Sequence, residues 1–162
     1  FTLPNLEGKP VQASSNAGKV VLMEFIFTSC PDICPTTTAN MVRMQQELKR
    51  KDWFGSKVQF VAVTFDPVRD TPEVFREYAQ RMGIDPSGWH LLRGDEALTK
   101  QIASEYGILV QKTGEGEFVH SVTSLTLIDA RRQIRNVYEM GEDMDNDRIL
   151  ADIASLVKEQ SG

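Results

Sequence analysis

The sequence predicts an α/β protein, with a central mixed β-sheet flanked by helices and a β-hairpin near its end. Two nearly continuous apolar runs, at 20–27 and 58–65, are typical of strands buried on both faces. Segments with apolar residues at helical spacing alternate with the strand patterns, which favours helices on both faces of the sheet. Two successive strand patterns, at 124–129 and 133–138, predict the hairpin and hence a mixed sheet.

Turn-forming and helix-capping residues mark the segments around the first two strands. The opening segment, 1–18, is rich in turn-forming residues, and no strand is predicted there. Pro35 is expected at the first position of the first helix, which should end near Lys51. Thr71 and Pro72 predict the start of a second helix, and Gly83 predicts its end. The residues expected on the buried face of this helix are Val74, Phe75, Tyr78, Ala79 and Met82.

The second half of the chain continues the alternation. A short strand at 90–92 leads to Asp95, which should cap a helix whose apolar residues include Leu98 and Ile102. Strand patterns start again near Ile108, with a loop marked by Gly114 and Gly116. Asp145 or Asn146 opens a last helix. Its apolar stripe is Ile149, Leu150, Ile153, Leu156 and Val157.

Length and composition predict one globular domain that spans residues 1–162. The chain is 41% apolar and 25% charged, and its net charge of −5 comes from interleaved acids and bases, which argues against nucleic acid as a partner. No apolar run reaches the roughly 18 residues that a membrane span needs. The sequence begins at Phe1 rather than at Met. We therefore expect that an anchor or a signal precedes this chain in the natural protein.

The two cysteines of the chain lie in one motif, Cys30-Pro-Asp-Ile-Cys34-Pro35, between the first strand and the first helix. Three intervening residues at a helix start allow the two sulfur atoms to approach each other. The partial positive charge of a helix N-terminus favours thiolate, which is both a nucleophile and a soft metal ligand. This placement predicts a functional site rather than a structural disulfide.

Topology is expected to bring other polar residues to the same edge of the sheet. The crossover helix makes the first two strands parallel, so Cys30 and Asp66 both follow strand ends at one edge. His120 precedes the strand at 124–129, which starts at that edge if it runs antiparallel to the first two. Two thiolates and one imidazole suit Cu(I), and Cu(II) with added oxygen ligands. Structural zinc prefers four protein ligands, which is more than two cysteines and one histidine supply. His90 is not counted as a ligand, because it is expected to be an ordinary, partly buried or surface strand residue.

Three stretches of the sequence resemble the Sco/SenC family of copper proteins. They are 18–35 with the cysteine motif, 65–72 with Asp66-Pro-x-x-Asp70-Thr-Pro, and Val119-His120-Ser121 before a strand. The resemblance covers nearly the whole chain and implies a thioredoxin-like fold. It also implies that Cys30, Cys34 and His120 bind copper. The family often has Asp immediately before this histidine, where this chain has Val119.

The resemblance further implies a metallochaperone that assists assembly of the copper centre of a respiratory cytochrome c oxidase. The implied partners are the copper-binding subunit of the oxidase and, in addition, another copper chaperone or a thiol reductase. Family members are usually tethered to a membrane. The domain would then face the periplasm, the outer cell surface or, in a eukaryote, the mitochondrial intermembrane space.

Two other functions remain open. A thiol–disulfide oxidoreductase would use Cys30 and Cys34 as a redox pair that forms a disulfide and reduces the cysteines of a target. A peroxiredoxin-like peroxidase would use Cys30 against peroxide, with Arg69 or Arg93 stabilising the thiolate. Asp66 is interpreted as a group that tunes the thiols, completes a Cu(II) site or contacts a partner. The alternative is that Asp66 is only a turn residue before Pro67.

Overall fold

A computed structural model of the 162-residue chain describes most of its backbone. The residues described are 2–12, 18–26, 33–64, 67, 69–105, 110–112, 118–120, 124–131, 133–139, 141 and 144–161.

The central sheet has five strands in the order β5-β4-β3-β8-β9. Strands β3 (Val20–Ile26), β4 (Val58–Thr64) and β5 (Trp89–Leu92) are parallel to one another. Strand β8 (Ser124–Ile128) runs antiparallel to β3, and β9 (Ile134–Glu139) runs antiparallel to β8. The predicted mixed sheet with a late hairpin is therefore confirmed.

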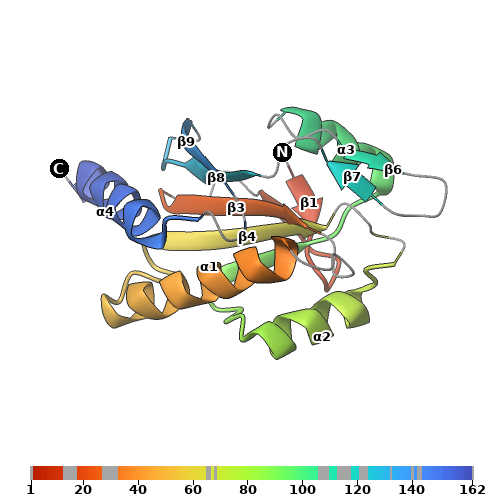
Figure 1. Ribbon diagram of the computed structural model, residues 1–162, viewed down its shortest axis with the longest axis horizontal. Coiled ribbons are helices and arrows are strands. Elements are labelled where there is room, and N and C mark those ends of the chain that lie inside the picture. Colours follow the sequence, from red (N-terminus) through yellow and green to blue (C-terminus); the bar gives the residue numbers. More distant parts are fainter. Residues whose placement is uncertain are drawn as a thin grey trace.

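Helices lie on both faces of this sheet. They are α1 (Ile33–Arg50), α2 (Pro72–Met82), α3 (Glu96–Glu105) and α4 (Asn146–Ser161). Helix α1 contacts both α2 and α4, and α4 also contacts β3. Figure 1 shows α1 and α2 below the sheet and α3 above it. This arrangement agrees with the α/β class that the alternating patterns predict.

Four predicted helix caps are present. Thr71 Oγ1 accepts a hydrogen bond from the amide of Val74, and Gly83 ends α2 in the left-handed conformation, with φ of 83°. The Oδ1 atom of Asp95 accepts from the amide of Leu98 at 3.1 Å. At α4, Asp145 Oδ1 accepts from the amide of Arg148 at 3.1 Å, so Asp145, and not Asn146, is the capping residue.

The start of α1 differs from the prediction. The helix begins at Ile33, so Pro35 occupies its third position rather than its first. The first four amides of a helix have no intrahelical acceptor, so a proline anywhere in this turn sacrifices no hydrogen bond. The prediction was wrong by two residues because proline marks the first turn and not one position within it.

Val74, which was predicted to be buried, is exposed, and so is Leu98, an apolar residue of the predicted third helix. Val74 on α2 is 40% exposed and Leu98 on α3 is 39% exposed, whereas Phe75 and Ile102 are buried at 0% and 3%. Val74 and Leu98 each occupy the third position of a helix. Their side chains therefore lie at the helix end, in the turn closed by the cap, rather than over the centre of the sheet.

Two small hairpins accompany the sheet. Strands β1 (Thr2–Pro4) and β2 (Pro10–Gln12) pair antiparallel in the opening segment, where no strand was predicted. Three residues per strand are too few for an alternating pattern to be recognised in sequence. Strands β6 (Val110–Lys112) and β7 (Phe118–His120) also pair antiparallel, in the region where strand patterns were predicted to start again.

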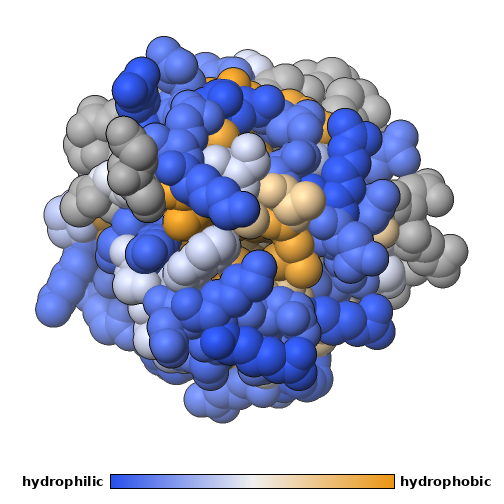
Figure 2. Space-filling view, turned by 90° about the vertical axis from the view of Figure 1, so that its left-hand side faces the viewer, coloured by the Kyte–Doolittle hydropathy of each residue, from blue (hydrophilic) through white to orange (hydrophobic). Residues whose placement is uncertain are grey.

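The core lies between the sheet and its helices. All seven residues of β3 and all seven of β4 are buried. Phe60 and Trp89 pack edge to face, with ring centroids 5.1 Å apart. The surface is more polar than this core. Figure 2 shows that the side of the molecule at the left of Figure 1 is mostly hydrophilic around a small apolar patch.

Candidate metal site

One end of the sheet gathers the elements that carry the predicted site. In the parallel pairing of β3 with β4, the last residues of the two strands, Ile26 and Thr64, are partners. Strand β8 runs the opposite way, with Thr126 beside Met23, so β8 begins where β3 ends. The topological condition for His120 to approach the cysteine motif is therefore met. These strand ends, the start of α1 and the β6–β7 hairpin share the right-hand side of Figure 1.

The cysteine motif spans the junction between β3 and α1. Cys34 is the second residue of α1, at the positive end of the helix dipole, where thiolate is favoured. Cys30 lies outside the described residues, in the connection between Ile26 and Ile33.

His120 is the last residue of β7, where it is paired with Val110. Only three residues separate it from Ser124, the first residue of β8. The backbone of His120 is therefore tied to the end of the sheet at which β3 and β4 finish.

Asp66 lies outside the described residues, between the end of β4 and Pro67. Side-chain hydrogen bonds stabilise the turn that follows it. Thr64 Oγ1 donates a 2.6 Å hydrogen bond to the carboxylate of Asp70, and both residues are fully buried. Arg93, immediately after β5, donates from Nε and Nη2 to the carbonyl of Pro67 and from Nε to that of Asp70.

A buried polar cluster beneath the start of α1 was not predicted from the sequence. Glu24 on β3 is fully buried and accepts a hydrogen bond from Thr38 Oγ1 at 3.3 Å. The hydroxyl of Tyr78 on α2 donates to the same Thr38 oxygen at 3.0 Å. Thr38 lies four residues after Cys34, on the same face of α1. The available signal was a glutamate within the otherwise apolar run of β3, because a buried acid requires polar partners.

The other histidine behaves as an ordinary strand residue. His90 on β5 is partly buried, and its Nε2 atom lies 3.0 Å from Gln59 Oε1. Burial lowers the pKa of His90, and the charge of Lys19 lowers it further. The prediction for His90 is confirmed.

The described residues offer no competing metal site, since no three His, Cys, Asp or Glu side chains among them are arranged to hold an ion. The chemistry of the predicted donor set fits copper, because thiolate and imidazole are the ligands that this metal prefers. No helix in the described part of the chain is long and apolar enough to cross a membrane.

Comparison with solved structures and family models gives a consistent assignment. The family model described as SCO1/SenC matches residues 1–158. A SCO1/SenC family lipoprotein from Bacillus anthracis str. Ames is 32% identical to the chain, with a TM-score of 0.86, and the match covers 96% of this chain and 92% of that one.

Two further solved structures carry functional descriptions. BsSco, described as having a disulfide switch and as a member of the Sco family of cytochrome c oxidase assembly proteins, is 29% identical, with a TM-score of 0.83 and coverage of 98% and 91%. Copper-bound ScoI of Arabidopsis thaliana is 26% identical, with a TM-score of 0.80 and coverage of 98% and 96%. The predicted thioredoxin-like fold is thus confirmed, and the chain belongs to the SCO1/SenC family.

Proposed function

We propose that this protein is a copper-binding assembly factor for a respiratory cytochrome c oxidase, with Cys30, Cys34 and His120 as the copper ligands. The observation that supports this most is that the ends of β3 and β4 lie at the same end of the sheet as the start of β8. A similar fold binds copper in the Arabidopsis relative.

The donor set determines which copper ions are bound. Cu(I) is soft and tolerates low coordination, so two thiolates and an imidazole satisfy it. Cu(II) accepts the same donors and gains from an additional oxygen ligand. A carrier with this site can hold either ion and pass it to a partner that offers thiolate and imidazole ligands of its own. The copper-binding subunit of the oxidase is the proposed recipient, and another copper chaperone or a thiol reductase is a further partner.

The second candidate is a thiol–disulfide oxidoreductase that reduces the cysteines of the target. It is favoured by the disulfide switch described for BsSco and by the position of Cys34 at a helix start. In this function one thiolate attacks the target disulfide, and the other displaces the target thiol while Cys30 and Cys34 become a disulfide. Copper and disulfide states exclude each other, because each requires both sulfur atoms.

The peroxidase alternative is less well supported. It requires a cation beside the thiolate, and Arg93 was one of two candidates. The guanidinium of Arg93 instead donates hydrogen bonds to the carbonyls of Pro67 and Asp70.

We also propose that the natural protein is tethered to a membrane, with this domain facing the periplasm, the outer cell surface or the mitochondrial intermembrane space. The relative from Bacillus anthracis is described as a lipoprotein, which supports a lipid anchor.

Anaerobic titration of the fully reduced protein with Cu(II), followed by visible absorption, tests the main proposal. We expect a sulfur-to-copper charge-transfer band that saturates at about one copper per chain. The opposite result is rapid bleaching, in which two Cu(II) ions take one electron each from the two thiols, leaving a disulfide, two Cu(I) ions and two protons. That result, with no stable copper complex, would favour the oxidoreductase.

A further inference from the structure

A groove lies at the end of β5, between the first turn of α3 and the end of β1. Its volume is about 570 Å³, and its lining includes Pro4, Pro67, Arg93, Gly94 and Leu98. Leu98 is 39% exposed. A single exposed leucine is ordinary at a protein surface, but this one lines a concave surface together with two prolines. We call this surface the Leu98 groove.

Arg93 holds the walls of the Leu98 groove in place. Its backbone amide donates to the carbonyl of Pro4 at 3.0 Å, and its Nη2 atom donates to the carbonyl of Pro67 at 2.8 Å. The next residue is Gly94, where a side chain would collide with Leu3 of β1. The groove is therefore formed before any partner arrives, so binding there does not require these segments to be ordered first.

The Leu98 groove lies at the same end of the sheet as the elements that carry the proposed copper site. Leu92, the last residue of β5, pairs with Val63 of β4, and Val63 pairs with Phe25 of β3. Neighbouring strands are about 4.8 Å apart, so the end of β5 lies about 10 Å from the end of β3. Helix α1, whose second residue is Cys34, also starts at this end (Figure 1).

Copper transfer by ligand exchange requires the donor atoms of the recipient to reach the bound ion, so the recipient has to cover this end of the sheet. A protein–protein interface of standard size buries about 800 Å² on each partner, and a round patch of that area extends about 16 Å from its centre. A patch centred on the end of β3 therefore reaches the Leu98 groove.

The charges beside the groove favour a basic partner. Asp95 is exposed and Glu96 is partly exposed at its edge. The cation of the lining, Arg93, directs its guanidinium to the carbonyls of Pro67 and Asp70. The groups that face solvent are therefore mainly acidic, in a chain whose net charge is −5. Such a surface attracts a segment that carries Lys or Arg beside its apolar residues.

We infer that the Leu98 groove is the docking site for the protein that receives copper, and that it takes an apolar side chain from a recipient loop with a Lys or Arg next to it. The inference rests on the proposed copper-binding function. A few apolar anchors contribute most of the binding energy of an interface. Leu98 should therefore control docking, whereas the copper ligands control metal affinity, and the two properties should be separable by mutation.

Rates of Cu(I) transfer test the inference. The recipient is the reduced, copper-free soluble domain of the oxidase subunit that binds copper. Leu98→Glu places a charge in the groove, and we expect the second-order rate constant of transfer to fall about tenfold. Transfer to the small chelator bicinchoninate should keep the wild-type rate, because a chelator needs no groove. Leu98→Ala, which adds no charge, should give an intermediate rate to the domain.

Ile134→Glu is the matched control. Ile134 is 49% exposed on β9 and pairs with Ile128, the last residue of β8, so it lies at the opposite end of the sheet. This variant should transfer copper at the wild-type rate to both recipients. Leu98 is the third residue of α3, and a glutamate in a first turn agrees with the helix dipole. Circular dichroism checks that each variant is folded, and Leu98→Ala serves if Leu98→Glu is not.

Glu96→Gln tests the contribution of charge. Transfer to the domain should be slower than in wild type at low salt, and the difference should disappear at high salt, where exposed charges are screened. A copper-free NMR titration accompanies the rate measurements. Addition of the copper-free domain should shift the amide signals of residues 94–99 in wild type and not in Leu98→Glu.

Three results would overturn the inference. They are wild-type transfer to the domain in Leu98→Glu, equal slowing in Ile134→Glu, and slowing of Leu98→Glu toward bicinchoninate as well. A wild-type dimer in sedimentation that Leu98→Glu dissociates would assign the groove to a second copy of the chain instead. A wild-type protein that binds no copper would contradict the proposed function, and the NMR titration would then decide by itself whether the groove docks the domain.

Discussion

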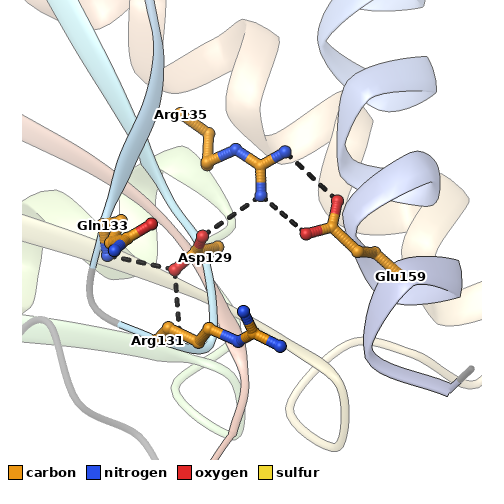
Figure 3. Close-up of polar contacts among 5 residues, drawn as sticks. All are labelled: Asp129, Arg131, Gln133, Arg135 and Glu159. Carbon is orange, nitrogen blue, oxygen red and sulfur yellow. Dashed lines mark hydrogen bonds and ion pairs between the residues drawn. The ribbon is translucent and has the colours of Figure 1, made fainter.

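Arg135 on β9 and Glu159 on α4 form a two-point ion pair, with 2.8 Å between Nη1 and Oε1 and 3.1 Å between Nη2 and Oε2 (Figure 3). The Nη1 atom of Arg135 also donates to Asp129 Oδ2 at 3.2 Å. The other oxygen of Asp129 accepts from the backbone amides of Arg131 and Gln133. Asp129 thereby organises the turn between β8 and β9, and Arg135 links that turn to the last helix.

The first prediction concerns this carboxylate. Burial opposes the ionisation of Asp129, but the amide of Gln133, the guanidinium of Arg135 and the amide of Arg131 together lower its pKa. Its contribution to stability is therefore complete above the unfolded pKa of about 3.9 and is lost as pH falls through the lower folded value. Asp129→Asn should reduce the free energy of unfolding at pH 7 by about 1–2 kcal/mol.

Urea denaturation at a series of pH values measures this effect. The difference between wild type and Asp129→Asn should shrink as pH falls below 4. Glu159→Gln is the control, since Glu159 is exposed and its loss should cost less than that of Asp129. A difference that is independent of pH would show that Asp129 acts by shape and not by charge.

A second prediction concerns His90, whose pKa is lowered by burial and by Lys19. The unfolded state binds more protons than the folded state between the folded pKa and the unfolded value of about 6.5. The free energy of unfolding should therefore rise with pH through this window, and His90→Gln should reduce that dependence. Proton NMR of the two histidines of the chain, assigned with His120→Gln, gives the folded value directly. A pKa above 6.5 would contradict the burial argument.

A third prediction uses two neighbouring residues of α2. Phe75 is fully buried and Val74 is 40% exposed. Phe75→Ala should destabilise the protein by about 3–5 kcal/mol, because it removes a large buried ring and leaves a cavity. Val74→Ala should change stability by no more than about 0.5 kcal/mol. Equal losses in the two variants, measured by thermal or urea unfolding, would mean that Val74 is covered in solution.

A fourth prediction separates the ligands of the proposed copper site. His120→Ala should weaken Cu(II) more than Cu(I), because the softer ion is held by two thiolates alone. Cys30→Ser and Cys34→Ser should each abolish stable Cu(II) binding. Competition with chelators of known affinity measures both ions. Equal losses of Cu(I) and Cu(II) in His120→Ala would argue against this division of roles.

The features that were predictable from the sequence depend on local patterns. The apolar runs of β3 and β4 identified buried parallel strands, and Thr71, Gly83 and Asp95 marked helix ends because capping uses residues close in sequence. The hairpin of β8 and β9 was predicted as well, but the direction of β8 relative to β3 was only a condition, and the structure shows that the two strands are antiparallel.

The features that were missed depend on contacts between distant residues. The acceptors of Arg93 lie 23 and 26 residues away, and Thr38 lies 14 residues from Glu24. No local pattern identifies such partners. The exposure of Val74 was missed for a related reason, since helical spacing predicts which face of a helix is buried but not how far the sheet extends beneath that face.

The proposed copper site consists of two sulfur atoms and one nitrogen. X-ray absorption at the copper edge, on the fully reduced protein loaded with one equivalent of Cu(I), counts these donors directly. We predict two sulfur donors and one imidazole nitrogen at copper, with the imidazole lost in His120→Ala and one sulfur lost in Cys34→Ser. A first shell of oxygen and nitrogen without sulfur, or one unchanged by these substitutions, would contradict it.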